Sequence, residues 1–590
     1  MDPIKVDFTG KGKSSGKKTV IIPPENARLK LIISIIGTVI FAAVAFYIML
    51  PPLNIKAKEL YYYIGLVIAS FIALIFITSK ALTKPEYTPY VKKVAVVPIV
   101  LAVVIALVAG VGVLASSVFF RARSYSELIT VDTNGKFDID IDETDFNSVP
   151  KLDESAAMSL ANRALSDLAN ENLVSQFTIQ SSIPQINYDE TPVRVAPLNY
   201  ASIIKWFTNR TEGLPGYIII DMAAENTRYV ALEEGMKYSP VDHFSRLLSR
   251  HLRFAYPTFM FEGSTFEVDE DGHPYWICAR IDKTIGLFGG RDIIGAVLVD
   301  AVTGESNYYT VDELTNDANL MWIDRVFSAQ ILVEQYDHFG SYRSGFWNSI
   351  LGQKNVIQTT EGYNYLAIND DVLLYTGVTS VTSDQSIIGF VLINQRTKEA
   401  VYYRVNGAKE YSAMETAEGL VKDYGFNSTF PLLVNVADEP TYFMALKDAS
   451  NVVQRYSMIN VKQYNKIKTV GETLGECLES YINVLEEYDI RVNKDDIDIP
   501  DDKNDIQVPE PDNGEKQKQT VTGVVEDIRS AVLDGGSYYF IKLEQNNAYY
   551  SIKASASPEV VILNKGQNVQ ITFEGDEKTI IPAIKLSVVE

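Results

Sequence analysis

Cysteine is scarce in this 590-residue chain, which contains only Cys278 and Cys477. Two cysteines are too few for the disulfide framework of a small secreted domain or for a four-ligand zinc site. Their number allows one disulfide. However, Cys278 lies in a strand-like run and Cys477 on the apolar face of a predicted helix, a context that favours buried free thiols.

Reactive sequence motifs are also missing. The four histidines include no H-E-x-x-H pair, and the chain has no nucleophile elbow, P-loop or glycine-rich dinucleotide motif. The sequence therefore predicts no catalytic residues, no cofactor and no enzyme activity. The alternative is a membrane-tethered envelope hydrolase using paired carboxylates, for which Asp269, Asp271 and Asp300 are the candidates.

Charge is distributed unevenly along the chain. Residues 1–125 carry a net charge of +10, which leaves −32 for the rest. Most of such an acidic surface repels nucleic acid and anionic lipid head groups, so we expect no nucleic-acid partner.

Three runs without any charged residue interrupt the basic part of the chain: Leu31–Ile55, Leu60–Ser79 and Val94–Phe120. Each is long enough to cross a hydrocarbon core, which needs about 20 residues of helix. The lysine-rich tail at 1–29 and the lysines between the second and third runs predict a cytoplasmic N-terminus. Three crossings within 30–120 then place the acidic remainder outside. A further alternative, an accessory subunit of a transport complex, is disfavoured because the spans contain no charge.

A hairpin pattern recurs in the acidic region, starting at Gly216, Gly295 and Gly389. Each copy has an Asp or Asn five positions after the glycine and a tyrosine thirteen positions after it. Such a pattern predicts an apolar strand, a polar turn and an aromatic strand. A looser strand-turn-strand starts at Tyr442. With predicted helices at 155–169, 243–252 and from Ser412, the pattern indicates an α+β exported region at 125–490, with repeats at about 150–240, 241–330 and 355–465.

The segment GAVLVDAVTGESNYYTVDE, which begins at Gly295, resembles the D-x-x-T-G-E hairpin of PepSY-type domains. These are small helix-plus-sheet modules of extracytoplasmic bacterial proteins. The resemblance implies a binding or inhibitory role rather than catalysis.

The C-terminal part begins with residues 491–519, whose charge and lack of large apolar side chains predict a linker. Residues 520–590 contain five strand-like runs and resemble an OB-fold barrel. This module lacks a basic groove, and its paired tyrosines are typical of cross-strand packing.

Two kinds of binding residue remain as candidates. The acidic clusters Asp138, Asp140 and Asp142, and Asp269 with Asp271, are weak candidates for calcium, and neither completes an EF-hand loop. Arg246, Arg250 and Arg253 lie on neighbouring turns of a predicted helix. They could receive an anion or an acidic partner, or simply pair with nearby carboxylates.

The sequence thus favours a bacterial plasma-membrane protein with three transmembrane helices, an α+β ectodomain of repeated hairpins and a small all-β domain. We expect it to bind, scaffold or regulate another envelope protein or a wall polymer.

Overall fold

A computed structural model describes residues 21–167, 173–189, 191–368, 371–380, 386–494 and 497–500. In the C-terminal part it describes 519–533, 536–544, 548–553, 557, 559–560, 563–573 and 580–588. The chain forms two compact units, Met1–Asp502 and Lys503–Glu590.

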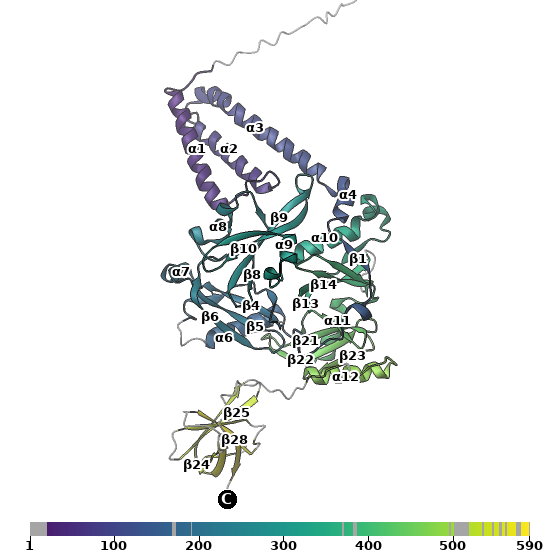
Figure 1. The fold of residues 1–590 in the computed structure, drawn as a ribbon. Coiled ribbons are helices and arrows are strands. Elements are labelled where there is room, and N and C mark those ends of the chain that lie inside the picture. Colours follow the sequence, from purple (N-terminus) through teal and green to yellow (C-terminus); the bar gives the residue numbers. More distant parts are fainter. Residues whose placement is uncertain are drawn as a thin grey trace, which may run out of the picture. The chain divides into compact units, whose positions relative to one another are not determined.

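Three long helices begin the described part of the chain, and each is apolar and long enough to cross a membrane (Figure 1). They are α1 Ala27–Met49, α2 Lys58–Thr78 and α3 Thr88–Ala115. The third predicted run is interrupted, because α3 ends at Ala115 and a short kinked helix, α4 Val118–Ser126, follows. A hydrogen bond of 2.8 Å between the Ser34 and Thr78 hydroxyls joins α1 to α2.

Four modules of one design follow. In each module, a helix precedes a sheet. Two short strands both pair with one long strand, and two further strands follow in order on the other side of that long strand. Modules one and two span 154–236 and 248–310. Module one contains α6 Glu154–Asp167, β2 Phe177–Ile179, β3 Gln185–Tyr188, β4 Thr191–Tyr200, β5 Leu214–Asp221 and β6 Thr227–Met236. Module two contains α8 Leu248–Ala255, β7 Met260–Phe261, β8 Thr265–Val268, β9 Pro274–Ile285, β10 Gly289–Asp300 and β11 Ser306–Thr310.

Modules three and four span 329–403 and 410–471. Module three contains α10 Ala329–Tyr342, β12 Ile357–Thr359, β13 Asn364–Ile368, β14 Asp371–Ser380, β16 Gly389–Asn394 and β17 Ala400–Tyr403, with β1 Val131–Gly135 added in parallel to β17. Module four contains α11 Glu410–Leu420, β19 Asn427–Ser428, β20 Leu432–Val436, β21 Glu439–Lys447, β22 Val453–Asn460 and β23 Lys468–Gly471. The connecting elements are η1 Pro85–Tyr87, α5 Phe137–Asp140, α7 Ile203–Asn209, η3 Phe244–Arg246, α9 Val311–Asn316, η4 Ala318–Leu320, η5 Asn348–Gly352, β15 Ser386–Ile387, β18 Gly407–Ala408 and α12 Leu474–Glu487.

The three predicted hairpins are confirmed as β5–β6, β10–β11 and β16–β17. At each turn the Asp or Asn side chain accepts a hydrogen bond from the backbone two residues later, at Ala223, Val302 and Arg396. The strand-turn-strand from Tyr442 is present as β21–β22. The equivalent of the other three hairpins, however, is β22–β23, where Asn460 accepts a hydrogen bond from the Gln463 backbone.

The glycine of each hairpin is required by close packing. A Cβ atom at Gly216, Gly295 or Gly389 would collide with a carbonyl oxygen of the facing strand and with the ring of the tyrosine thirteen residues later. Two of these tyrosines, Tyr308 and Tyr402, donate their hydroxyls to the carbonyls immediately before the glycines. The ring therefore occupies the space that a side chain would take.

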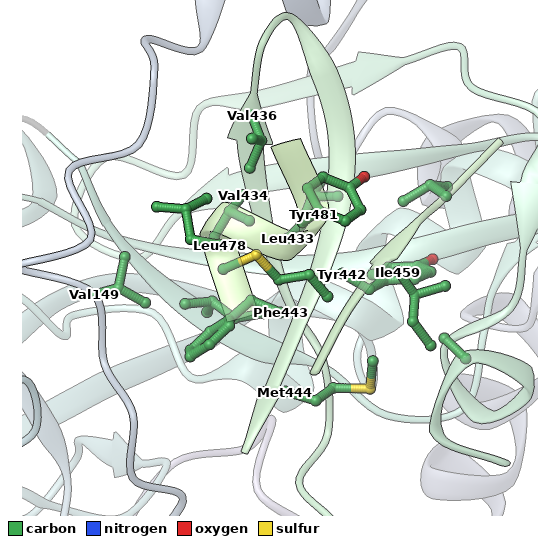
Figure 2. Packing of buried hydrophobic residues seen from close by; sticks show 14 of the residues in the cluster. Val149, Leu433, Val434, Val436, Tyr442, Phe443, Met444, Ile459, Leu478 and Tyr481 are labelled. Atoms are coloured by element: carbon green, nitrogen blue, oxygen red, sulfur yellow. The ribbon is translucent and has the colours of Figure 1, made fainter. Parts of the chain in front are cut away.

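Neighbouring modules share their cores, so the sheets are stacked. In β10, Val297 and Val299 enter a core shared with module one, whereas Ala296 and Leu298 enter a core shared with module three. Period-two alternation sends successive side chains to opposite faces, and burial of both faces explains the continuous apolar runs of these strands. A third core contains residues of modules three and four and of α12. Figure 2 shows part of it, including Phe443 of module four and Leu478 of α12.

Two predicted helices differ from the structure. The helix predicted at 243–252 is broken at Leu247, whose ψ of 117° is not helical, into the short η3 and α8. The helix predicted from Ser412 starts earlier, at Glu410. Both cysteines are free and buried.

The C-terminal unit contains the five predicted strands: β24 Gln519–Leu533, β25 Gly536–Leu543, β26 Tyr549–Lys553, β27 Asn568–Phe573 and β28 Ile580–Val588. They pair in the order β24-β25-β26-β28-β27, and β27 pairs back to β24. Tyr550 is buried in its core, whereas Tyr549 donates its hydroxyl to Asp527. Most of the predicted linker at 491–519 lies outside the described residues.

Candidate ligand pocket at the helix ends

The ends of the long helices are hydrogen-bonded to module two. The Arg253 Nε atom donates to the Leu50 carbonyl just after α1 at 2.9 Å, and Lys56 in the α1–α2 connection pairs with Asp282 at 2.8 Å. After α3, the Ser116 hydroxyl accepts from the backbone of Leu287 at 2.9 Å and of Phe288 at 3.1 Å. Module two therefore contacts the ends of α1 and α3 and the connection between α1 and α2 (Figure 1).

Glycines at the tip of the β9–β10 hairpin permit this contact. A Cβ atom at Gly286 would lie 2.5 Å from the Ser116 hydroxyl oxygen, and its φ of +62° is one that glycine adopts without strain. On the helix side, a Cβ at Gly112 would lie 2.7 Å from the Leu287 side chain. Small residues on both partners therefore let the hairpin tip approach the backbone of α3.

Two of the three predicted arginines, Arg250 and Arg253, lie near the same junction. Arg246 donates to the Arg210 carbonyl. The Arg250 guanidinium lies 4.1 Å from the centre of the Tyr47 ring near the end of α1, and Arg253 follows on the next turn. None of the three forms an ion pair with a carboxylate among the described residues.

Arg253 is a buried cation with an unused donor. It is 7% exposed, and its Nε and Nη1 atoms donate to the carbonyls of Leu50, Tyr256, Pro257 and Phe259. Its Nη2 atom makes no hydrogen bond within the described part of the chain. Burial lowers the pKa of Arg253 to about 10, so it stays charged at neutral pH.

Arg253 lines a cavity of about 640 Å³ between the α1–α2 connection and module two. Volumes of this order are typical of small-molecule sites. The apolar wall comes from Leu50, Pro52, Leu248, Leu252, Met260, Phe261 and Ile281. The charged wall holds five cations, Lys56, Lys58, Arg253, Lys283 and Arg291, and two carboxylates, Glu59 and Glu262.

Ion pairs account for only some of these charges. Arg291 bridges Glu262 at 2.8 Å and Glu334 at 2.6 Å. Lys283 is half-buried and forms no ion pair with any described carboxylate. Burial and then the nearby Arg291 charge lower the pKa of Lys283, although Glu334 and Glu262 act in the opposite direction. We call this cavity, with Lys58, Arg253 and Lys283 as its unpaired cations, the juxtamembrane pocket.

The calcium candidates at 138–142 lie elsewhere. Asp138 and Asp142 line an open, largely acidic hollow of about 1090 Å³ beside α12, while Asp140 accepts a hydrogen bond from the Lys136 backbone. Among the described residues, no group of three or more His, Cys, Asp or Glu side chains is arranged to hold a metal ion.

Asp269, Asp271 and Asp300 lie at neighbouring turns of module two. Asp269 accepts from the backbone of Asp271 and His273, in the turn between β8 and β9. The imidazole of His273 lies 3.2 Å from Asp300. Burial raises the pKa of Asp300, but hydrogen bonds led by those from Thr303 outweigh it and lower the pKa. A lowered pKa suits a turn-stabilising carboxylate and not a general acid.

Sequence reasoning identified Arg253 but missed the other cations of the pocket. Lys56 and Lys58 lie between the first two apolar runs, and Lys283 lies near the end of β9. One available signal was the pair of lysines directly before a transmembrane run on its predicted outer side.

Comparisons with known proteins add no assignment: no family model matches the chain, and no curated protein matches it.

Proposed function

We propose that the protein is a membrane-anchored binding or regulatory protein of the bacterial cell envelope, without catalysis of its own. Its four modules stand on the outer side of the plasma membrane, where they bind an envelope protein or wall polymer. The observation that carries this proposal is the attachment of module two to the ends of α1 and α3 and to the α1–α2 connection. An array attached in this way is held at a defined height above the bilayer.

The distribution of charge supports this placement. The connection between α2 and α3 and the residues before α1 carry most of the lysines of the helical region, which favours the cytoplasm for those ends. The opposite ends contact the acidic modules.

The small domains support a binding role. The helix-plus-sheet design of the four modules is the one that the PepSY resemblance implies. The strand order of the C-terminal unit, with β26 parallel to β28, is also compatible with an OB-like barrel. Stacked repeats and small barrels provide extended interaction surfaces.

Site-specific photocross-linking in intact cells tests the proposal. A photoreactive residue would replace Phe207 in module one or Tyr424 in module four, which are 51% and 59% exposed. The control position is Leu82, which is 73% exposed and lies between α2 and α3.

We expect a discrete adduct with an envelope component from at least one ectodomain position, and its digestion by protease added to intact cells. Adducts that form only from Leu82, or that resist external protease, would contradict the proposal.

A further inference from the structure

We propose that the juxtamembrane pocket binds the phosphate group of an anionic phospholipid from the outer leaflet. This inference rests on the proposed placement of the helices in the membrane and names a ligand for the site described above.

The donors suit a phosphate. Arg253 is held in place by four backbone carbonyls, so its free Nη2 atom is oriented before any ligand arrives. Lys283 and Lys58 provide two more cations on the charged wall. Guanidinium and ammonium groups in a partly desolvated site form strong charge-assisted hydrogen bonds with phosphate oxygens.

The position suits a lipid. The pocket is bounded by Leu50 and Pro52 after α1 and by Ala57 before α2, the depth at which head groups meet the protein. Ile48 and Ile55, close to these bounds in the chain, are 68% and 67% exposed, so apolar side chains are accessible in this part of the chain. An acyl chain can follow this surface while the phosphate remains with the cations.

The surroundings disfavour a free soluble anion. The chain after residue 125 carries a net charge of −32, which repels anions approaching from the aqueous side. A lipid diffusing within the membrane reaches the pocket without crossing that surface.

The test compares lipid retention by the full-length protein in native mass spectrometry. The detergent-solubilised protein is titrated with short-chain phosphatidylglycerol, short-chain phosphatidylcholine or inorganic phosphate. The pocket variant combines Lys58→Gln with Lys283→Gln, because neither amine makes a hydrogen bond within the described structure. The matched control combines Lys205→Gln with Lys422→Gln, on modules one and four.

We expect the wild-type and control proteins to retain phosphatidylglycerol in preference to phosphatidylcholine. The affinity of the pocket variant for phosphatidylglycerol should be about tenfold lower, since each lost charge weakens attraction to an anionic lipid. An unchanged preference in the pocket variant would overturn the inference. Displacement of phosphatidylglycerol by equimolar inorganic phosphate would also overturn it, because the ligand would then be the free ion.

The cross-linking experiment separates this inference from the proposed function. If the modules bind an envelope partner while the pocket variant retains lipid normally, only the lipid assignment fails.

Discussion

Modules two and four share a strand order but differ in the length of their central strands. The central strands β9 and β10 of module two are 12 residues each, whereas β21 and β22 of module four have 9 and 8. The extra length carries the β9–β10 tip to Ser116 after α3. The longer hairpin thus makes module two an attachment point, although its strand order is the same as that of module four.

Their hairpins also differ chemically. In modules one to three, a glycine lies five residues before the turn Asp or Asn, and in module two Tyr308 packs against this glycine, Gly295. In module four, the residue five positions before Asn460 is Arg455. The polar turn is common to all four copies, and the Gly–Tyr pair to only three. The turn is thus the more general determinant of this hairpin.

The largest expected effect on stability comes from replacing Gly295 with valine, compared with the same replacement at Arg455. Gly295→Val forces a side chain into the facing Tyr309 carbonyl and the Tyr308 ring, and should cost about 4 kcal/mol of stability. Arg455→Val removes an ion pair with the largely exposed Glu472 and should cost about 1 kcal/mol or less. Thermal unfolding of the detergent-solubilised protein measures both, and equal losses would contradict the comparison.

A buried acid of module two predicts a fall in stability toward neutral pH. Burial raises the pKa of Glu267 to about 7 from an ordinary value of 4.5, although its carboxylate accepts hydrogen bonds from the backbone of Asp324 and Arg325. The folded chain therefore holds this proton more tightly than the unfolded chain. The stabilisation is fully present below pH 4.5 and is lost as the pH rises to about 7.

Glu267→Gln should remove that dependence. Relative to the variant, the wild-type protein should lose up to about 3 kcal/mol of unfolding free energy as the pH rises from 4.5 to about 7. The measurement is the melting temperature across this pH range. Parallel curves for the two proteins would show that Glu267 does not titrate there.

An ion pair between the start of module one and module four predicts the opposite sign at acid pH. Burial alone would raise the pKa of Asp153, but its hydrogen bond with Lys447 of β21 and its cap on α6 at Ala156 lower it below 3.8. This stabilisation is present above the ordinary pKa and is lost as the pH falls through the lowered one. Asp153→Asn should lower stability at neutral pH, and its difference from the wild-type protein should shrink as the pH falls through the lowered pKa. A difference that stays equally large at acid pH would contradict this assignment.

The smallest effect concerns the shared turn. Asp300→Ala and Asn460→Ala each remove a side-chain acceptor for a turn N–H and should each cost about 1 kcal/mol. Unfolding of both variants under one condition checks the equivalence of the two turns. A negligible loss for Asn460→Ala alone would argue against placing β22–β23 in the repeat.

The sequence predicted what depends on local pattern. Uncharged runs predicted the three helices, and the spacing from Gly295 to Asp300 and Tyr308 predicted its hairpin. The register of module four was missed because Arg455 replaces the glycine that marks the repeat.

The pocket was missed for a different reason. Arg253 and Leu50 are 203 residues apart, and Lys56 and Asp282 are 226 apart. Such contacts arise only from the tertiary fold. The break at Leu247 was also missed, since the apolar spacing alone favoured one continuous helix.

Thiol labelling of intact cells tests the placement of the modules most directly. The native Cys278 and Cys477 are both buried, and burial raises the pKa of Cys477 to about 12, so neither should react. Lys422→Cys in module four and Lys84→Cys between α2 and α3 then each present one exposed thiol. A membrane-impermeant maleimide should label the Lys422→Cys protein in intact cells and the Lys84→Cys protein only after permeabilisation. The reverse pattern would contradict the account.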